Sequence, residues 1–250
     1  MLKLTAHLRE RHHLTADAVA SMYALYAAYY ESTSPDMFAA DLSEKTHVIL
    51  LYGSAGELCG FSTLSLWESV YEGRPFRVVF SGDTIIHHRH WGDQSLALAF
   101  CRFAGHAKAQ LPDVPLYWFL ISKGHRTYRY LHLFSQTYWP SYRDDTHPKL
   151  QPIVAALARK KFGESYDPAT SVIRFPSSRG HLRPNWAQVR ENLKLRPEVE
   201  FFLKQNPGYA QGDELACITE LREDNLRSVA RRAFMLGYHG VTRWPHPDAA

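Results

Sequence analysis

The 250-residue sequence contains little cysteine and no long apolar run, and each of these shortages excludes a class of protein. Its three cysteines, Cys59, Cys101 and Cys217, are odd in number and far apart, so we expect neither a disulfide framework nor a CxxC zinc knuckle. Each lies in an apolar neighbourhood and is predicted to fill the core. No uninterrupted apolar run reaches the ~18 residues of a membrane span, so we expect no transmembrane segment. The first residues also lack the apolar segment of a signal peptide, which predicts a cytoplasmic protein.

The charge of the chain is small and is not concentrated in one segment. The formal net charge is +4, and charged residues make up 22% of the sequence. The densest basic segments, residues 159–162 and 227–232, lie on helix-like patterns, which favours solvated helix faces over a nucleic-acid surface. We therefore expect no nucleic-acid partner, and the mild positive excess suits an anionic small ligand.

The chain is apolar enough, at 45% hydrophobic residues, to bury a large core, and its first half has a clear periodicity. Residues 14–32 and 34–45 show the three- and four-residue apolar spacing of helices, with Thr15 and Ser34 as predicted caps. Residues 47–88 then predict three strands, separated by the turn sequences GSAGE and EGRP. These strands form a predicted antiparallel meander.

A strand–helix–strand–helix unit begins with the last strand of the meander. Gly82 indicates a bulge or a close backbone approach in its first strand, over residues 76–88. Residues 94–110 and 124–139 predict helices, and the wholly apolar residues 116–122 between them predict a strand buried on both faces. The predicted fold class is therefore α/β, with a mixed, mostly antiparallel central sheet and helices on both faces.

Residues 143–250 predict an α+β C-terminal extension to a first domain over residues 1–142. A helix is expected over residues 147–163, and strands over residues 170–176 and 212–221. We expect the extension to pack on the first domain, or to form an acceptor surface or a homodimer interface. Its aromatic content suggests the hypothesis of an enlarged apolar space for a long acyl chain or a bulky acceptor. The residues of that hypothetical space are Trp139, Tyr142, Trp186, Phe201, Phe202 and Tyr209.

The segment HHRHWGD lies where the strand over residues 76–88 meets the next helix. A helix N-terminus offers free backbone N–H groups and a partial positive charge, which favour phosphate binding. Arg89, Gly92 and the amides of Asp93, Gln94 and Ser95 are the candidate parts of such a site. The alternative is an ordinary strand-to-helix turn with histidines at the surface.

The same segment is dense in potential metal ligands. His87, His88, His90 and Asp93 are close together in sequence, but no matching cysteine or carboxylate motif completes a metal site. We therefore expect no metal cofactor here.

The motif RHWGDQ and the order of elements resemble those of the GNAT superfamily of acyl-CoA-dependent acyltransferases. That family's phosphate loop is Gln or Arg, two residues, Gly, one residue, then Gly or Ala. Arg89 and Gly92 match it, Gln94 departs from it, and the resemblance covers residues 1–140. It implies a GNAT-like fold and acyl-CoA as co-substrate. The residues that it implies in cofactor binding are Ile85, Ile86, His87, Arg89, His90, Trp91, Gly92, Asp93, Gln94 and Ser95.

The resemblance also implies a catalytic tyrosine on the helix after the buried strand. Tyr130 lies where the family places the residue that protonates the departing thiolate, and Phe134 lies near the usual aromatic residue that follows. Tyr128 is the neighbouring alternative. Core packing, with the hydroxyl hydrogen-bonded, is the competing interpretation for either tyrosine.

The implied reaction is direct attack of an amine or hydroxyl of a small-molecule acceptor on an acyl thioester. The thioester is carried by coenzyme A, or by the phosphopantetheine arm of an acyl carrier protein. Candidate bases are Asp83 and His87 on one strand and Glu68 on the preceding one. Strand alternation places Asp83, Ile85 and His87 on one face, so Asp83 and His87 are predicted to share a cleft.

Two other functions remain open from the sequence. His88 and Asp93 have the H-x-x-x-x-D spacing of glycerolipid acyltransferases, in which the histidine acts as base. A non-catalytic acyl-CoA-binding protein is the other alternative, because Gln94 stands where the GNAT loop has Gly or Ala.

Overall fold

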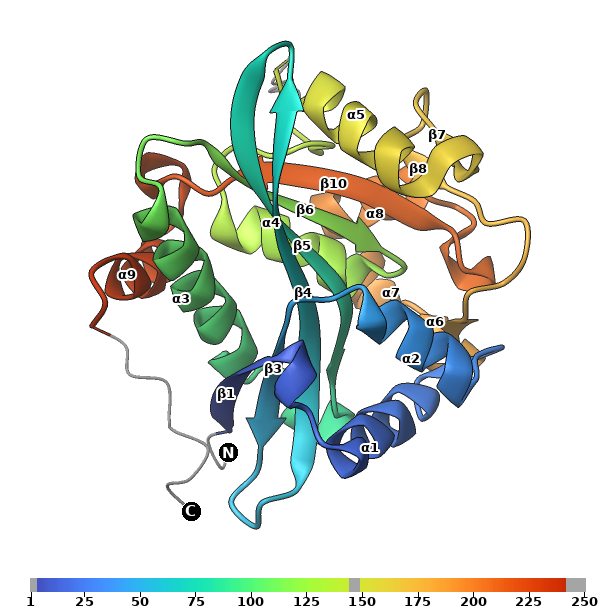
Figure 1. The fold of residues 1–250 in the computed structure, drawn as a ribbon. Helices are drawn as coiled ribbons and strands as arrows, with labels where there is room; N and C mark the ends of the chain where they lie inside the picture. Colours follow the sequence, from blue (N-terminus) through green and yellow to red (C-terminus); the bar gives the residue numbers. More distant parts are fainter. Residues whose placement is uncertain (1–3, 144–148, 242–250) are drawn as a thin grey trace.

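A single sheet organises the molecule, in a computed structural model that describes residues 4–143 and 149–241. Among these residues, eight strands hydrogen-bond in the order β1-β3-β4-β5-β6-β10-β8-β7 (Figure 1). Only β5 and β6 run parallel within the described sheet, and every other neighbouring pair is antiparallel. The mixed, mostly antiparallel sheet predicted from the sequence is confirmed. The strands are β1 (Thr5–Glu10), β3 (His47–Tyr52), β4 (Leu58–Tyr71), β5 (Arg74–Ile86), β6 (Leu116–Ser122), β7 (Tyr166–Asp167), β8 (Val172–Ile173) and β10 (Glu214–Glu220).

Helices cover both faces of this sheet, as predicted. A short second sheet pairs β2 (Tyr30–Glu31) with β9 (His181–Leu182). The N-terminal caps of the first two helices are also confirmed, since Thr15 and Ser34 accept hydrogen bonds from Ala18 N and Met37 N. The helices are α1 (Ala16–Ala27), α2 (Pro35–Ser43), α3 (Ser95–Gln110), α4 (His125–Phe134), α5 (Leu150–Phe162), α6 (Pro184–Ala187), α7 (Glu191–Lys194), α8 (Pro197–Gln205) and α9 (Ser228–Tyr238).

Alternating residues of the strands build a separate core on each face. On β3, Val48 and Leu50 pack with α1 and α2, whereas Ile49 and Leu51 pack toward α3. On β10, even-numbered apolar residues pack with α5, and odd-numbered ones pack with α4, α8 and α9. The helices α1, α2 and α5 thus lie on one face, and α3, α4, α8 and α9 lie on the other (Figure 1).

The C-terminal extension packs on the first 142 residues by completing their sheet. The strand β10 pairs antiparallel with β6 along Leu215–Glu220, and it confirms the strand predicted over residues 212–221. The helix α9 packs against α3 so closely that a Cβ on Gly105 would overlap the carbonyl oxygen of Phe234. Cys59, Cys101 and Cys217 are all free and buried, as predicted.

Several predictions about the extension need correction. The helix predicted over residues 124–139 ends at Phe134, because Ser135 turns into a bridge with Leu226 and the chain becomes extended. The strand expected over residues 170–176 shortens to Val172–Ile173. The start of the helix predicted over residues 147–163 lies outside the described residues, and α5 accounts for the rest.

The hypothesis of one enlarged aromatic space is wrong, because its residues are divided among three clusters. Trp139 packs with the α5 core, Trp186 packs with the α1 core, and the other four pack with the core of α3, α4 and α9. Phe202 alone is fully buried among them. These side chains therefore fill cores rather than line one pocket.

The two parallel strands diverge, which opens the sheet near its middle. The strand β5 pairs with β6 only from Arg77–Leu116 to Ser81–Leu120. Just beyond, β5 bulges against β4 beside Gly82, which confirms the bulge predicted there. A Cβ on Gly82 would lie 2.8 Å from Thr63 Oγ1, so glycine permits this close approach. Past the bulge β5 pairs only with β4, and the described ends of β5 and β6 no longer hydrogen-bond to each other.

Candidate functional site

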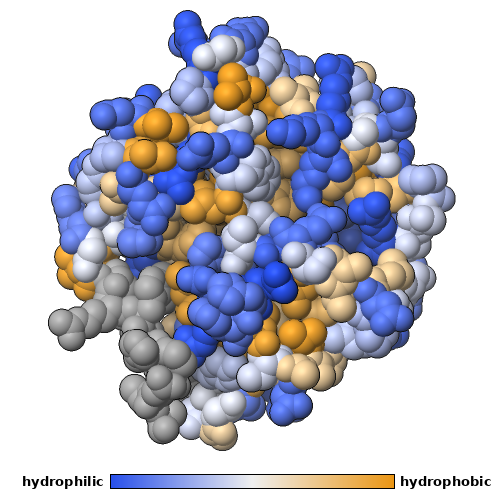
Figure 2. All heavy atoms as spheres, viewed as in Figure 1, coloured by the Kyte–Doolittle hydropathy of each residue, from blue (hydrophilic) through white to orange (hydrophobic). Residues whose placement is uncertain are grey.

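Two pockets lie beside the opening between β5 and β6, one on each face of the sheet. The α3–α4 pocket, of about 500 Å³, lies on the face covered by α3, α4 and α9. The α2–α5 pocket, of about 440 Å³, lies on the face covered by α1, α2 and α5. Figure 2 shows that hydrophilic residues dominate the surface seen in the view of Figure 1, with separate apolar patches between them. No helix in the described part of the chain is both long and apolar enough to cross a membrane.

The α3–α4 pocket joins the end of β5 to the loop before α3 and to α4. Gly92 in this loop has φ +101°, a backbone conformation that favours glycine. Asp93 lies two residues before α3, and its carboxylate accepts hydrogen bonds from the first helical amide, Ser95 N, at 2.7 Å and from Leu4 N at 3.4 Å. The lining residues from β5, this loop and the two helices are Ile86, Trp91, Gly92, Asp93, Gln94, Ala97, Leu98, Cys101, His125, Arg126, Arg129, Tyr130, Leu133 and Phe134.

The positive charges of this pocket come from α4 and not from the loop. Arg89 is exposed on the 3₁₀ turn before the loop and lines neither pocket. Arg126 and Arg129 line the pocket instead. The Arg126 guanidinium lies 4.1 Å from the ring centre of Trp91, and Arg129 Nε lies 3.2 Å from Glu198 Oε1. Sequence analysis missed both arginines, although their i, i+3 spacing places them on one side of a helix.

Tyr130 and Tyr128 have different surroundings. Tyr130 lines the α3–α4 pocket, and burial, followed by the charge of Asp93, raises the pKa of its hydroxyl. Tyr128 is fully buried and donates its hydroxyl hydrogen to the carbonyl oxygen of Pro140 at 2.9 Å. The tyrosine available to a ligand is therefore Tyr130, and Tyr128 is a core residue.

The histidines that follow β5 pack around Tyr29. The hydroxyl of Tyr29 accepts a hydrogen bond from His88 N at 2.6 Å and lies 3.1 Å from His88 Nδ1. The ring of Trp186 packs against His88, and the ring of His87 stacks on His88 with centroids 4.3 Å apart. Burial lowers the pKa of His87, with the charges of His88, Arg89 and His90 as smaller causes. This cluster holds the turn before α3 against α1 and α6.

The structure does not bring Asp83 and His87 together, contrary to the predicted shared cleft. The strand β5 ends at Ile86, so His87 begins a turn and lines neither pocket. Asp83 lines the α2–α5 pocket, and Ile85 is buried in the core against α1 and α2. Glu68 is exposed on β4 and lines neither pocket. Of the three candidate bases, Asp83 alone faces one of these two pockets.

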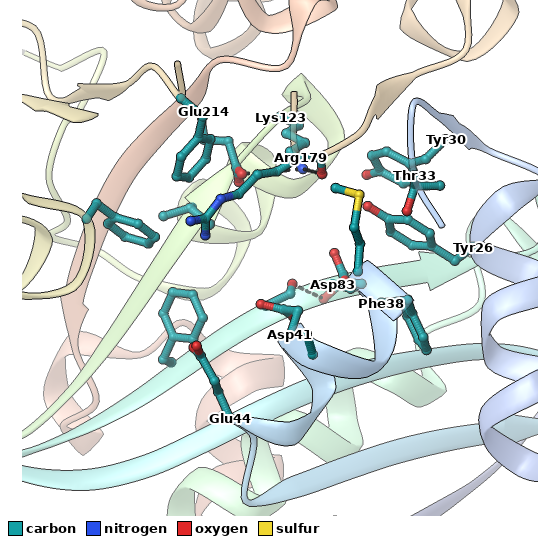
Figure 3. A pocket seen from close by; sticks show the side chains of 18 of the residues that line it. Tyr26, Tyr30, Thr33, Phe38, Asp41, Glu44, Asp83, Lys123, Arg179 and Glu214 are labelled. Atoms are coloured by element: carbon teal, nitrogen blue, oxygen red, sulfur yellow. Dashed lines mark hydrogen bonds and ion pairs between the residues drawn. The ribbon is translucent and has the colours of Figure 1, made fainter. Parts of the chain in front are cut away.

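The α2–α5 pocket is rich in charged groups that come from distant parts of the chain (Figure 3). Three ion pairs lie in it or at its wall. Lys45 Nζ lies 2.6 Å from Asp41 Oδ2, Lys123 Nζ lies 3.4 Å from Glu214 Oε1, and Lys161 Nζ lies 3.2 Å from Glu44 Oε2. The sequence did not predict Lys123, Glu214, Tyr26 and Tyr30 as site residues, because no motif links them.

Asp83 differs from the other carboxylates of this pocket. The described residues give its carboxylate neither a hydrogen bond nor an ion pair, although the side chain is half-buried. Burial and the nearby charge of Asp41 raise the pKa of Asp83 to about 7, against the opposing effects of Lys123 and Lys45. The group therefore changes charge near neutral pH, as a general base requires.

Two tyrosine rings close the pocket beside Asp83. Tyr26 and Tyr30 stack nearly parallel, with ring centroids 4.5 Å apart. Burial and the charge of Asp83 raise the pKa of both hydroxyls. Both tyrosines consequently stay protonated and uncharged at neutral pH.

The other interpretations of the histidine-rich segment find no geometric support. His88 pairs with Tyr29 and Asp93 pairs with backbone amides, so the described atoms contain no His88–Asp93 hydrogen bond of the glycerolipid-acyltransferase kind. The grouping of potential metal ligands found in the described residues is Glu10, His12 and His13, which are all exposed. It lies outside both pockets.

The protein is similar to solved structures of acyltransferases at low sequence identity. A conserved Enterococcus faecalis protein of unknown function, described as a probable N-acyltransferase, is 14% identical with a TM-score of 0.40, over 54% of this chain and 33% of that one. The chain thus spans about a third of that protein. A GNAT family N-acetyltransferase from Escherichia coli in complex with CoA is 17% identical with a TM-score of 0.36, over 52% of this chain and 69% of that one. An acyl-CoA N-acyltransferase from Pseudomonas aeruginosa is 18% identical with a TM-score of 0.39, over 54% and 91% of the two chains.

The Escherichia coli structure is named as a member of the family that the sequence resembles. Neither a scan of protein-family models nor a search of curated proteins found a match.

Proposed function

We propose that the protein is an acyltransferase that moves an acyl group from a coenzyme A thioester to an amine. The donor occupies the α3–α4 pocket, and the acceptor occupies the α2–α5 pocket on the other face of the sheet. The observation that carries this proposal is the opening between β5 and β6, which has a pocket on each side. An acyl carrier protein can present the same phosphopantetheine arm to the α3–α4 pocket.

The α3–α4 pocket supplies the groups that a phosphate-bearing donor needs. Arg126 and Arg129 offer charged N–H donors, and Gly92 lets the backbone of the loop come close to a ligand. Ile86 and Leu98 offer apolar contact for the pantetheine arm. We assign phosphate binding to the arginines of α4 and not to Arg89, because Arg89 is exposed and does not line the pocket.

The chemistry is direct transfer. The amine nitrogen attacks the thioester carbonyl carbon, and the C–S bond breaks when the tetrahedral intermediate collapses. Asp83, as the carboxylate, accepts the proton that the amine loses, and Tyr130 donates its hydroxyl proton to the departing thiolate. The raised pKa of Tyr130 keeps that hydroxyl protonated at neutral pH. The products are an amide, free coenzyme A as the thiol, protonated Asp83 and a tyrosinate that solvent reprotonates.

The donor half of the proposal is tested by binding alone. Acetyl-CoA, a long-chain acyl-CoA and free coenzyme A should raise the melting temperature, since each would bind only the folded protein. Arg126→Ala should weaken donor binding by about tenfold or more, because it removes a charge-assisted contact to phosphate. The matched control, Arg89→Ala, should leave binding unchanged. Absence of binding by all three compounds overturns the proposal.

The catalytic half is tested by release of free thiol from acetyl-CoA in the presence of primary amines. Thiol release that depends on both the amine and Asp83 supports transfer. Donor binding without thiol release for any amine would instead identify an acyl-CoA-binding protein. The departure of Gln94 from the GNAT loop pattern is the observation that favours that second candidate.

A further inference from the structure

In the α2–α5 pocket, all but two of the charged side chains form ion pairs with a described residue of opposite charge. The lysines at positions 45, 123 and 161 are paired with Asp41, Glu214 and Glu44. Two charged lining groups are left over, the carboxylate of Asp83 and the guanidinium of Arg179. Neither side chain has an ion pair or hydrogen bond with any described residue. The pocket therefore presents one unpaired negative and one unpaired positive group to a ligand.

The two unpaired groups come from different parts of the fold. Asp83 lies on the floor, at the bulge of β5 beside the opening of the sheet. Arg179 lies on the loop before β9, and its guanidinium reaches into the pocket from the rim (Figure 3). Lys123 Nζ donates to the carbonyl oxygen of Arg179 at 3.3 Å, which holds this loop over the pocket. The guanidinium centre lies 4.5 Å from the ring centre of Phe175, so its N–H edge is left for a ligand.

Aromatic side chains line part of the pocket that holds these charges. Rings from α1, β2, α2, β5, α5 and the loop before β9 line it, and they suit the apolar body of a ligand. These residues are Tyr26, Tyr30, Phe38, Phe80, Phe162 and Phe175.

We propose that the α2–α5 pocket binds an amino carboxylic acid with an apolar or aromatic body, its ammonium group beside Asp83 and its carboxylate on Arg179. Arg179 is then a specificity-determining residue, because a guanidinium binds a carboxylate through two parallel hydrogen bonds. A single carboxylate also matches the single unpaired positive charge of the pocket. The role of this ligand as acyl acceptor rests on the function proposed above, whereas its binding does not.

The proposal is tested by calorimetric titration of the full chain without acyl donor. Three matched probes share one ring and differ in charge: L-phenylalanine, 2-phenylethylamine without the carboxylate, and 3-phenylpropionate without the amine. L-phenylalanine should bind at least about tenfold more tightly than either analogue, a difference of about 1.4 kcal/mol. The dipeptide Phe-Gly separates the same two groups further, so comparing it with L-phenylalanine distinguishes a free amino acid from a peptide as ligand.

Two variants assign the preference to Arg179. Arg179→Gln should weaken binding of the zwitterion to the level of 2-phenylethylamine, while binding of 2-phenylethylamine stays the same. Arg174→Gln is the matched control on the same loop, because Arg174 pairs with Asp167 and Asp213 and does not line the pocket. The proposal is overturned if 2-phenylethylamine binds as tightly as L-phenylalanine and Phe-Gly do. It is also overturned if Arg179→Gln leaves the preference for L-phenylalanine unchanged.

The test separates this inference from the proposed function. If acetyl-CoA binds but no zwitterion is preferred, the acceptor assignment fails and the donor site stands. If the preference depends on Arg179 but no coenzyme A thioester binds, the amino-acid site stands and the acyltransferase proposal fails.

Discussion

The ionisation of Asp83 makes the stability of the protein depend on pH in a predictable direction. Its pKa in the folded protein is raised from 3.8 to about 7, with burial as the main cause and the charge of Asp41 as the next. Lys123 and Lys45 face the same group and oppose the shift, and Glu214 adds to it. Because the folded state holds this proton more tightly than the unfolded chain does, protonation stabilises the fold. That contribution is complete below the unfolded pKa and is lost as the pH rises through about 7.

The size of the effect follows from the two pKa values. In the folded protein the carboxyl is about 99% protonated at pH 5 and about 9% protonated at pH 8, whereas in the unfolded chain it is mostly ionised at both. Folding therefore binds close to one proton over about two of these pH units. For each such pH unit, the free energy of unfolding changes by about 1.4 kcal/mol. Wild-type protein should therefore lose about 2 to 3 kcal/mol more stability than Asp83→Asn between pH 5 and pH 8.

Urea denaturation of both proteins at pH 5 and pH 8 measures this difference. The comparison with Asp83→Asn cancels the titration of groups that both proteins share. Asp113→Asn, which changes an exposed aspartate between α3 and β6, is the matched control and should differ from wild type equally at both pH values. If Asp83→Asn behaves as this control does, Asp83 is an ordinary ionised carboxylate, and its assignment as a base that changes charge near neutral pH is refuted.

Three further predictions test the site and the fold. Tyr130→Phe should slow turnover about 100-fold or more with little change in donor affinity, since it removes a proton donor, and steady-state kinetics with a binding titration measure this. Tyr128→Phe should instead cost about 1 kcal/mol of stability, because the carbonyl of Pro140 loses its partner; the reverse pattern would exchange their roles. Gly105→Ala should destabilise the protein by about 1 to 3 kcal/mol in urea denaturation, because its Cβ overlaps the backbone of Phe234. An unchanged midpoint would mean that α9 does not pack on α3 in this way.

The order of the elements was predictable because each depends on local rules. Thr15 and Ser34 cap their helices through bonds to residues three positions ahead, which the sequence alone can indicate. Gly82 was a local signal too, because a glycine inside a strand pattern indicates a bulge or a close backbone approach. In the structure, a side chain there would meet Thr63 and Lys45. The apolar run of β6 was likewise enough to predict a strand buried on both faces.

The positive groups of the α3–α4 pocket were predicted less well, because a motif in sequence does not determine which side chains point into a pocket. Arg89 matches the expected loop pattern, yet the 3₁₀ turn that follows β5 leaves it exposed. The charges in the pocket belong to Arg126 and Arg129, whose position depends on how α4 packs beside α3. His87 was assigned to the cleft by extending strand alternation past Ile86, where the strand ends.

The charge pattern of the α2–α5 pocket could not be predicted from sequence spacing, because it depends on which charged side chains pair with one another. Asp83 is unpaired only because Lys45 bonds to Asp41 and Lys123 bonds to Glu214, which is 91 positions away in the sequence. If either lysine bonded to Asp83 instead, the opposite charge would lower the pKa of Asp83, and its carboxyl group would be ionised well below neutral pH. The chemistry of this pocket is thus decided by the partners that the fold gives to two lysines, and a sequence without those partners leaves Asp83 indistinguishable from any other aspartate.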